Sequence, residues 1–310
     1  MAKHFLTLLD ISKQELEVLL TVTTKIKSKP IRFSKAMSQK SLLMIFAKPS
    51  LRTRISFEVG MTQMGGSGIY YDILTSPMGK KETIADTAKT TSRYVDIIMA
   101  RLFEHKDIEE LAKYSEVPVI NGLTNFSHPC QIASDLFTIW EKKGKLSGLK
   151  LAYLGDANNN VTHSLLLGCS KMGINISIGC PGETQFLPLK DVVESAKKIA
   201  QENNVAIEVT DDPVKAVQDA DIVYTDSWMS YHIPEKEQNK RIKTLKNYQV
   251  NKELMQKAKP DAVFMNCLPA MRGMEQTADV IDSHQSIVFD QAENRLHMQK
   301  AIMLWLIGKV

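Results

Sequence analysis

The chain has 310 residues, of which 44% are hydrophobic and 24% are charged, a composition typical of a globular protein large enough for two domains. Its net charge of +4 is small and dispersed, which argues against a nucleic-acid-binding protein but is compatible with a small anionic substrate. We predict no signal sequence and no membrane-spanning segment, and the four cysteines lack the spacing of a metal site or a disulfide framework. We therefore expect a cytoplasmic protein.

Strand-like and helix-like segments alternate along the chain in two series. Short apolar runs predict strands at residues 41–46, 97–100 and 117–120, and then at 149–154, 174–178, 206–209, 222–224 and 262–265. Helical patterns fill the gaps between these runs. This alternation predicts an α/β protein with two doubly wound domains, each a parallel sheet flanked by helices.

The two series set the expected domain boundaries. The first domain is predicted to span residues 1–135, and an apolar helix at about 293–310 is predicted to dock back on it and complete it. The second domain is predicted to span residues 136–292. A helix over residues 132–145, IASDLFTIWEKKGK, is predicted to join the two domains.

The stretch FAKPSLRTRISFE, residues 46–58, combines a predicted helix start with concentrated positive charge. Ser50 is a plausible N-cap, and the spacing beyond it predicts a helix with Ile55, Val59 and Met61 along one face. Arg52 and Arg54 fall in the first turn, where free backbone N–H groups already carry partial positive charge. Such an arrangement favours a bound anion at the helix start.

Polar side chains recur at the carboxyl ends of the predicted strands, where open α/β sheets bind ligands. In the first half they form a cationic set that suits a phosphate ester or an acyl phosphate: Arg52, Arg54 and Arg101 with His128 and Gln131. In the second half they offer amides and a carboxylate, which suit an amino acid or an amine: Asn158, Asn159, Asn160 and Asp226, with Cys267 nearby.

Each of these residues also has a purely structural explanation. First-turn arginines are often solvated, and an isolated arginine such as Arg101 is often a surface charge. His128 precedes a proline and could be a turn residue, and consecutive asparagines often form a turn or cap a helix. Asp226 could cap the following turn, and Cys267 could be a small buried hydrophobe. Their joint placement at strand ends favours a site.

Six motifs, in order and along essentially the whole chain, resemble those of the transcarbamylase (aspartate/ornithine transcarbamylase) family, and are closest to its ornithine-using members. They are KPSLRTRISFE, HPCQ, GDANNNVTHS, DSWMS, NCLPAMRGMEQT and FDQAENRLHMQKA. The resemblance implies transfer of the carbamoyl group of carbamoyl phosphate to the δ-amino group of L-ornithine, which gives L-citrulline and phosphate for arginine biosynthesis. It also implies that no metal or organic cofactor takes part, and that the partners are these small molecules and other subunits of a homotrimer or a multiple of trimers, with no nucleic acid and no membrane.

The resemblance also implies which residues form the site. The first domain would bind carbamoyl phosphate and the second ornithine. The carbamoyl phosphate contacts would be Ser50, Leu51 through its backbone, Arg52, Thr53, Arg101, His128, Gln131, Cys267, Leu268 and Arg295. The ornithine contacts would be Asn160, Asp226, Ser230 and Tyr231, and the catalytic residues would be Arg101, His128, Cys267 and Asp226. Direct transfer needs no covalent role for Cys267, and the Leu268-Pro269 bond is expected to be cis.

Three positions depart from the family's pattern and leave the acceptor amine open. Asn266 stands where a histidine is typical, Asn125 replaces an expected aspartate, and Tyr231-His232 replaces the Met-Gly of a mobile loop. A sister transcarbamylase acting on putrescine or an N-acylated ornithine is therefore the alternative, although putrescine has no α-carboxylate to bind.

Other functions fit the sequence less well. Enzymes that use aspartate have a different second half, and the retained arginines, His128 and Cys267 disfavour a homologue that binds carbamoyl phosphate without catalysis. The segment GDANNN lacks the G-x-G-x-x-G spacing of a dinucleotide-binding dehydrogenase.

Overall fold

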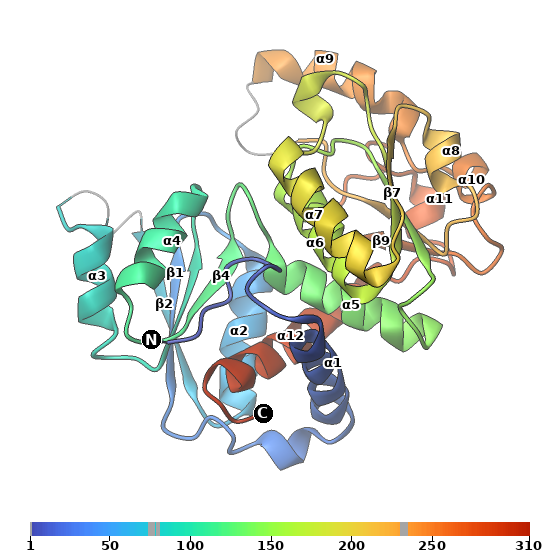
Figure 1. The fold of residues 1–310 in the computed structure, drawn as a ribbon. Coiled ribbons are helices and arrows are strands. Elements are labelled where there is room, and N and C mark those ends of the chain that lie inside the picture. Colours follow the sequence, from blue (N-terminus) through green and yellow to red (C-terminus); the bar gives the residue numbers. More distant parts are fainter. Residues whose placement is uncertain (1, 74–77, 79–80, 230–234) are drawn as a thin grey trace. The chain divides into compact units, whose positions relative to one another are not determined.

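The computed structural model describes residues 2–73, 78, 81–229 and 235–310 (Figure 1). The chain divides into two compact units, unit 1 formed by Met1–Phe137 with Glu293–Val310 and unit 2 formed by Thr138–Ala292. It passes from unit 1 to unit 2 within helix α5 (Pro129–Lys143) and returns within helix α12 (Val288–Leu306). Each unit contains one parallel sheet flanked by helices, which confirms the predicted α/β class.

Unit 1 is built on a four-stranded parallel sheet in the order β2-β1-β3-β4. Its strands are β1 (Ser41–Phe46), β2 (Ser67–Asp72), β3 (Ile97–Arg101) and β4 (Val119–Leu123). Besides parts of α5 and α12, its helices are α1 (Lys13–Ser28), the 3₁₀ turn η1 (Pro30–Phe33), α2 (Leu51–Gln63), α3 (Ile84–Thr91) and α4 (His105–Tyr114).

Strand β2 was not predicted from the sequence. Its residues, SGIYYD, form an edge strand that pairs with β1 among the described residues, and they are half-buried or exposed along the whole strand. An edge strand does not need a continuous run of apolar residues. The residues Ile69, Tyr70 and Tyr71 after Gly68 form too short an apolar run to predict a strand.

The core of unit 1 forms on both faces of this sheet. On one face, alternate strand residues such as Leu43, Ile45 and Ile98 pack with residues of α3 and α4. On the other face α2 packs closely with α12, since a Cβ atom built on Gly60 would lie 3.5 Å from the Lys300 side chain. The C-terminal helix therefore belongs to the first unit.

Unit 2 contains a five-stranded parallel sheet in the order β7-β6-β5-β8-β9. Its strands lie within about one residue of the predicted positions and are β5 (Lys150–Leu154), β6 (Asn175–Gly179), β7 (Ile207–Thr210), β8 (Ile222–Thr225) and β9 (Val263–Asn266). Its helical segments are α6 (Asn160–Met172), η3 (Thr184–Phe186), α7 (Lys190–Asn203), α8 (Pro213–Val217), α9 (Glu235–Leu245), η4 (Lys246–Tyr248), α10 (Lys252–Met255) and α11 (Ala278–Ile281).

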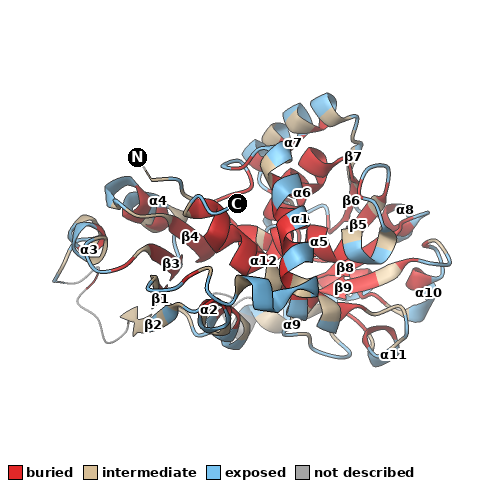
Figure 2. Ribbon diagram, turned by 90° about the horizontal axis from the view of Figure 1, so that it is seen from below, coloured by how far each residue is buried: buried red, intermediate tan, exposed pale blue. Residues whose placement is uncertain are grey.

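Helices cover both faces of the second sheet as well. Residues of α8, α10 and α11 pack with Ala152, Leu154, Val223 and Phe264 in one apolar cluster. Helix α6 is buried from its second residue to its last, and it packs against α7. Figure 2 shows the inner strands of the sheets as mostly buried. Strands buried on both faces explain why each was visible in the sequence as a short apolar run.

In each sheet the strand order reverses at one point, and ligands of open α/β sheets bind there at the carboxyl ends of the strands. In unit 1 the reversal lies between β1 and β3, which lead to Ser50 and end at Arg101. In unit 2 it lies between β5 and β8, which lead to Asn160 and Asp226. The topology alone therefore brings the predicted site residues of each unit to one edge of its sheet.

A glycine turn between α2 and β2 is a sensitive point of unit 1. A Cβ atom on Gly66 would lie 2.6 Å from Met61 Cε and 2.9 Å from the backbone oxygens of Lys40 and Met37. We expect Gly66→Ala to lower the free energy of unfolding by about 2–3 kcal/mol, measured by urea denaturation, because two of these neighbours are backbone atoms that cannot yield. Gly182→Ala is the control, since nothing lies within 4 Å of its added Cβ, and an equal loss in both variants would contradict the steric explanation.

Candidate active site

The predicted site residues of each unit form what we term its half-site. The start of α2 forms one side of the unit 1 half-site. Ser50 is the N-cap, as predicted, because its side chain accepts a hydrogen bond from Thr53 N at 3.3 Å. Arg52 is half-buried, and Thr53 is 1% exposed. The remaining N–H groups of this first turn and the partial positive charge of the helix end are suited to an anion.

The Thr53 hydroxyl is shared by two buried arginines from distant parts of the sequence. Arg101 Nη1 lies 3.5 Å from Thr53 Oγ1, and Arg295 Nη2 lies 3.4 Å from it. Arg101 is the last residue of β3, where the register with β4 shifts, and such irregularities often redirect a side chain at a site. Arg295 comes from α12 and also donates to Gln131 Oε1, so the residue that the family resemblance assigned to the site contacts two others.

The His128 imidazole lies among these guanidinium groups. Its pKa is lowered well below the usual value, first because the ring is buried and then because of the nearby charges of Arg295, Arg101 and Arg52. The ring is therefore neutral at neutral pH, and a neutral imidazole can still donate one hydrogen bond. The sequence predicted three cations and one imidazole here, and the structure brings Arg52, Arg101 and Arg295 near His128.

The third cation is Arg295, however, and not Arg54. Arg54 Nε lies 3.3 Å from Glu58 Oε2, and its guanidinium lies 4.0 Å from the centre of the Tyr70 ring. Ile55 is 50% exposed, whereas Met61 is fully buried, so the expectation that Ile55, Val59 and Met61 share one helix face was wrong. The buried face of α2 instead carries small and polar residues beside its apolar ones: Thr53, Ser56, Phe57, Gly60 and Met61.

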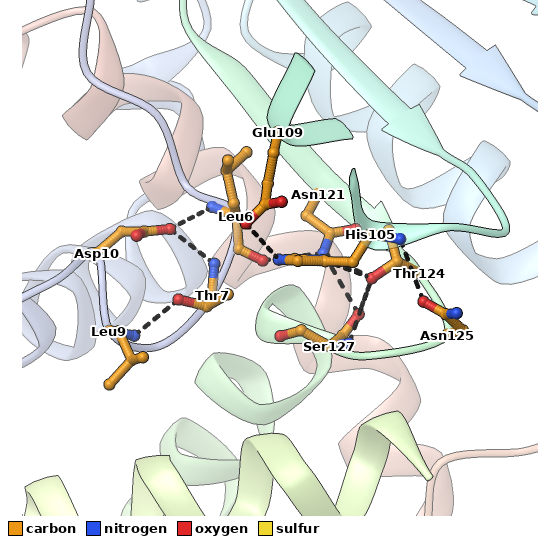
Figure 3. Close-up of polar contacts among 10 residues, drawn as sticks. All are labelled: Leu6, Thr7, Leu9, Asp10, His105, Glu109, Asn121, Thr124, Asn125 and Ser127. Carbon is orange, nitrogen blue, oxygen red and sulfur yellow. Dashed lines mark hydrogen bonds and ion pairs between the residues drawn. The ribbon is translucent and has the colours of Figure 1, made fainter. Parts of the chain in front are cut away.

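A hydrogen-bond network holds the turn that precedes His128 (Figure 3). Asn121 Nδ2 donates to Leu6 O at 2.8 Å and lies 3.4 Å from Ser127 O, while Thr124 N donates to Ser127 O at 3.0 Å. His105 Nδ1 lies 2.9 Å from Thr124 Oγ1. The position of His128 is therefore set by a turn that is tied to the N-terminal segment and to α4.

Asn125, where the family pattern has aspartate, lies in the same turn. Its Oδ1 accepts from His105 N at 3.1 Å in the first turn of α4, and its Nδ2 donates to Glu104 Oε2 at 3.2 Å. An aspartate could make only the first contact and would face the Glu104 carboxylate. The asparagine is therefore the better local partner in this chain.

The unit 2 half-site begins in the turn after β5. Asn158 N donates to Asp156 Oδ1 at 3.0 Å, and Asn159 is the N-cap of α6, accepting from Thr162 N at 2.9 Å. The structural explanation therefore holds for Asn159. Asn160, the predicted ligand contact, is the first residue of α6 and is half-buried.

Asp226 and Cys267 meet at the ends of the neighbouring strands β8 and β9. Cys267 Sγ donates to Asp226 Oδ1 at 3.1 Å, and both residues are half-buried. Cys267 is therefore a hydrogen-bonded, half-buried residue at a strand end and is not simply a buried hydrophobe. None of the four cysteines, all of which lie in the described part of the chain, forms a disulfide.

The loop after Cys267 is held by Asn266, which stands where a histidine is typical of the family. The Leu268-Pro269 bond is cis, as expected, and Leu268 has a positive φ of 56°. Asn266 is fully buried, its Oδ1 accepts from Leu268 N at 2.8 Å, and its Nδ2 donates to Gln276 Oε1 at 3.0 Å. Asparagine thus supports this turn directly.

Glu275 is a site-proximal residue that sequence reasoning missed, and its only signal was its place inside the NCLPAMRGMEQT motif. The side chain is 1% exposed, and its Oε1 accepts from Met271 N at 2.8 Å. Burial is the main cause that raises the pKa of Glu275 to about 7, and the nearby charge of Asp226 raises it further.

Ser230 and Tyr231, predicted to contact ornithine, and His232 beside them lie outside the described residues. The side chain of Leu51, whose predicted contact is through the backbone, is 71% exposed. Within the described part of the chain, no three His, Cys, Asp or Glu side chains are grouped as metal ligands. Among the same residues, none of the helices combines the length and the apolar character needed to cross a membrane.

Residues 3–141 match the family model described as the carbamoyl-P binding domain of aspartate/ornithine carbamoyltransferase, and residues 147–306 match its Asp/Orn binding domain. The chain therefore belongs to the aspartate/ornithine carbamoyltransferase family.

Its relatives include several proteins named for ornithine. The chain is 51% identical over 310 residues to ornithine carbamoyltransferase of Thermococcus kodakarensis, with 99% of this chain and 97% of that protein covered. It is 48% identical over 313 residues to the anabolic ornithine carbamoyltransferase of Pyrococcus furiosus, with 99% and 97% covered.

Solved structures with these names share the fold. Ornithine carbamoyltransferase from Pyrococcus furiosus matches with a TM-score of 0.95 at 48% identity, covering 100% of this chain and 98% of that chain. Ornithine transcarbamoylase from Giardia lamblia matches with a TM-score of 0.92 at 37% identity, covering 100% and 99%. These similarities confirm the predicted family and fold, and their names agree with the predicted ornithine carbamoyltransferase activity.

Replacing Glu275 should change how stability depends on pH. Because the folded pKa of about 7 lies above the ordinary 4.5, the folded protein binds more protons than the unfolded chain between these values, and stability falls as pH rises through them. We expect the isosteric Glu275→Gln variant to gain about 2–3 kcal/mol in the free energy of unfolding, relative to the parent, between pH 5 and pH 8.

Urea denaturation at both pH values measures this gain. Glu202→Gln, which removes the carboxyl group of an exposed glutamate in α7, is the matched control. A difference between Glu275→Gln and the parent that stays constant with pH would show that Glu275 is already ionised in the folded protein at pH 5.

Proposed function

We propose that the protein transfers the carbamoyl group of carbamoyl phosphate to the δ-amino group of L-ornithine, which gives L-citrulline and phosphate. The observation that carries this proposal is the convergence of Arg52, Arg101 and Arg295 around a neutral His128, beside the free N–H groups of α2. Such a site suits a ligand that is both strongly anionic and hydrogen-bond accepting, as an acyl phosphate is. Relatives about half identical along the full chain are named ornithine carbamoyltransferase.

Unit 1 is proposed to be the carbamoyl-phosphate-binding domain. Its contacts to the phosphate and to the carbamoyl group would be made by Ser50, the Leu51 backbone, Arg52, Thr53, Arg101, His128, Gln131 and Arg295. Unit 2 is proposed to bind ornithine through Asn160 and Asp226, and through Ser230 and Tyr231 as predicted from the resemblance. Cys267 and Leu268 would lie beside the carbamoyl group and the attacking nitrogen.

In this reaction, hydrogen-bond donors that are already in position would provide most of the transition-state stabilisation. When the neutral δ-amino group attacks the carbonyl carbon, negative charge develops on the carbonyl oxygen. The guanidinium of Arg101, the N–H of the neutral His128 ring and the Thr53 hydroxyl would stabilise that charge. The departing phosphate can accept the proton, so a dedicated general base is not required.

Asp226 would bind the acceptor amino acid. Cys267 would hold the Asp226 carboxylate in position and would form no covalent bond to a substrate. The Cys267 thiol donates to the Asp226 carboxylate, which fixes the carboxylate beside the loop of Leu268. A carboxylate held in this way is suited to the ammonium group of an amino acid, and the α6 start at Asn160 offers an amide at the neighbouring strand end.

We further propose a cytoplasmic homotrimer, or a multiple of trimers, that works in arginine biosynthesis. The biosynthetic direction is supported by the relative named anabolic. The trimer is supported by exposed apolar side chains on α2, where Leu51 is 71% and Ile55 is 50% exposed. Together with Arg54, Glu58, Val59 and Thr62 they line a shallow groove of about 520 Å³, a surface that subunit contact would remove from water.

The activity is tested by supplying carbamoyl phosphate with ornithine, putrescine, N-acetylornithine or aspartate and measuring ureido product and released phosphate. We expect citrulline formation to exceed the product from every other acceptor by about 100-fold or more in kcat/KM, the range in which bound polar groups discriminate. Product from a different acceptor alone would refute the ornithine assignment while leaving the reaction class intact.

The same assay separates the two halves of the site. Arg52→Ala is expected to raise the KM for carbamoyl phosphate by about 100-fold, because it removes a charge-assisted contact to phosphate. Asp226→Asn is expected to raise the KM for ornithine far more than that for carbamoyl phosphate. Arg93→Ala, which removes an exposed arginine of unit 1, is the control. An unchanged carbamoyl phosphate KM in Arg52→Ala would refute the anion site.

The proposed assembly is tested by light scattering on the purified protein. The parent is expected to have the mass of three 34.8 kDa chains or of a multiple of three. Ile55→Glu places a charge on the exposed face of α2 and is expected to lower the mass, whereas Val214→Glu, on an exposed site of unit 2, is not. A monomeric parent would rule out the trimer.

A further inference from the structure

Arg241 extends from α9 into the interior of unit 2 and contacts three separate segments. Its Nε donates to Trp228 O at 2.7 Å, and its Nη2 donates to Asp156 Oδ2. Its guanidinium also lies 4.9 Å from the centre of the Phe186 ring. The side chain is 13% exposed and that of Asp156 is 7% exposed, so the pair is largely shielded from water.

The two hydrogen-bonded partners of Arg241 belong to the segments that carry the acceptor contacts. Trp228 lies two residues beyond Asp226, and Asp156 opens the turn that leads to Asn160. These segments follow β8 and β5, the neighbouring strands at which the sheet order of unit 2 reverses. One guanidinium group therefore links both sides of the proposed ornithine half-site.

Hydrogen bonds in the turn at Asp156 connect Arg241 to the start of α6. The other carboxylate oxygen, Asp156 Oδ1, accepts from Asn158 N, and Asp156 O accepts from Tyr153 Oη at 2.7 Å and from Asn159 Nδ2. Asn159 in turn caps the helix that begins with Asn160. Movement of the Asp156 side chain would therefore displace the predicted ligand contact.

On the other side, close packing around Trp228 connects α9 to the segment that follows Asp226. The Trp228 indole is 1% exposed and lies over Gly155, where an added Cβ would be 3.1 Å from Nε1. Leu245, one turn beyond Arg241 in α9, packs with Trp228 and Phe186 in one apolar cluster. Helix α9 is thus fixed to the segment that follows Asp226 by a charged and an apolar contact together.

We propose that Arg241 is a positioning residue for the acceptor amino acid, because it sets the spacing between Asp226 and Asn160 without touching the substrate itself. This inference rests on the proposed function. A planar guanidinium can donate to the carboxylate and to the carbonyl at the same time, whereas a lysine ammonium at the end of a flexible stem can satisfy at most one of them well. Arg241 is therefore a determinant of ornithine affinity that lies outside the predicted site residues.

Arg241→Gln and Arg241→Lys test the proposal by a split in the KM values for the two substrates. Displacement of binding groups by about 1 Å can cost up to 100-fold, so we expect Arg241→Gln to raise the KM for ornithine by about tenfold or more. Arg241→Lys should give a smaller rise. The KM for carbamoyl phosphate should stay within about twofold of the parent value, because its proposed contacts in unit 1 are untouched.

Two further variants separate positioning from a general loss of structure. Lys215→Gln breaks the exposed ion pair with Glu208 in the same unit and should leave both KM values unchanged. Asp156→Asn keeps an oxygen for Asn158 N but weakens the link to Arg241, and it should raise the KM for ornithine selectively. Thermal denaturation confirms that each variant measured is folded, and Arg241→Lys or Asp156→Asn serves if Arg241→Gln is not.

A KM for ornithine that stays at the parent value in a folded Arg241 variant would overturn the inference, and so would an equal rise for both substrates. Failure of the proposed function is a different result, since the parent itself would then form no citrulline.

Discussion

Three arginines of unit 1 lie near the start of α2, where the backbone dipole of the helix is already positive. This concentration of positive charge is unfavourable by itself, and the surrounding hydrogen bonds hold the arginines in place. Burial and the nearby charges of Arg295, Arg101 and Arg52 lower the pKa of His128, so these cationic groups repel one another and a bound anion would relieve the repulsion. The shared Thr53 hydroxyl and the network before His128 hold these groups in place before a ligand arrives. Because the groups are already ordered, less of the binding energy is lost to their reorganisation. Anion binding should also stabilise the fold by mass action.

Unit 2 carries the opposite charge at the corresponding edge of its sheet. Burial and the nearby charge of Asp226 raise the pKa of both Asp156 and Glu275, and Arg241 forms a largely shielded ion pair with Asp156. Each sheet therefore presents side chains of one dominant charge where its strand order reverses. Two reactants of different charge, an acyl phosphate and an amino acid, match this division more closely than a single extended ligand would.

Much of this arrangement was visible in the sequence, because buried parallel strands require apolar runs and helix starts require caps. Residues 41–46 and Ser50 were therefore placed correctly, as were the strands of unit 2. Strand β2 was missed because an edge strand needs no such run. No local pattern could bring Arg295 to Thr53 across more than 200 residues, and only the family resemblance assigned it. Arg241 lies in a strongly charged helix segment, EKEQNKRIKTL, where one largely shielded arginine looks like exposed residues such as Lys240 and Lys243. Its contacts depend on tertiary packing, which the pattern of a single helix does not encode.

The path of the chain through α5 and α12 has a consequence for how the molecule is made. Unit 2 is one continuous segment, whereas unit 1 needs residues 293–310, which the ribosome adds after all of unit 2. The N-terminal part of unit 1 is synthesised first, yet α2 cannot pack with α12 until translation has passed through the entire second unit. Arg295 belongs to that late segment, so a nascent chain cannot assemble the three-arginine site. Arg52, Arg101 and Arg295 can therefore meet around His128 only after α12 has docked on unit 1.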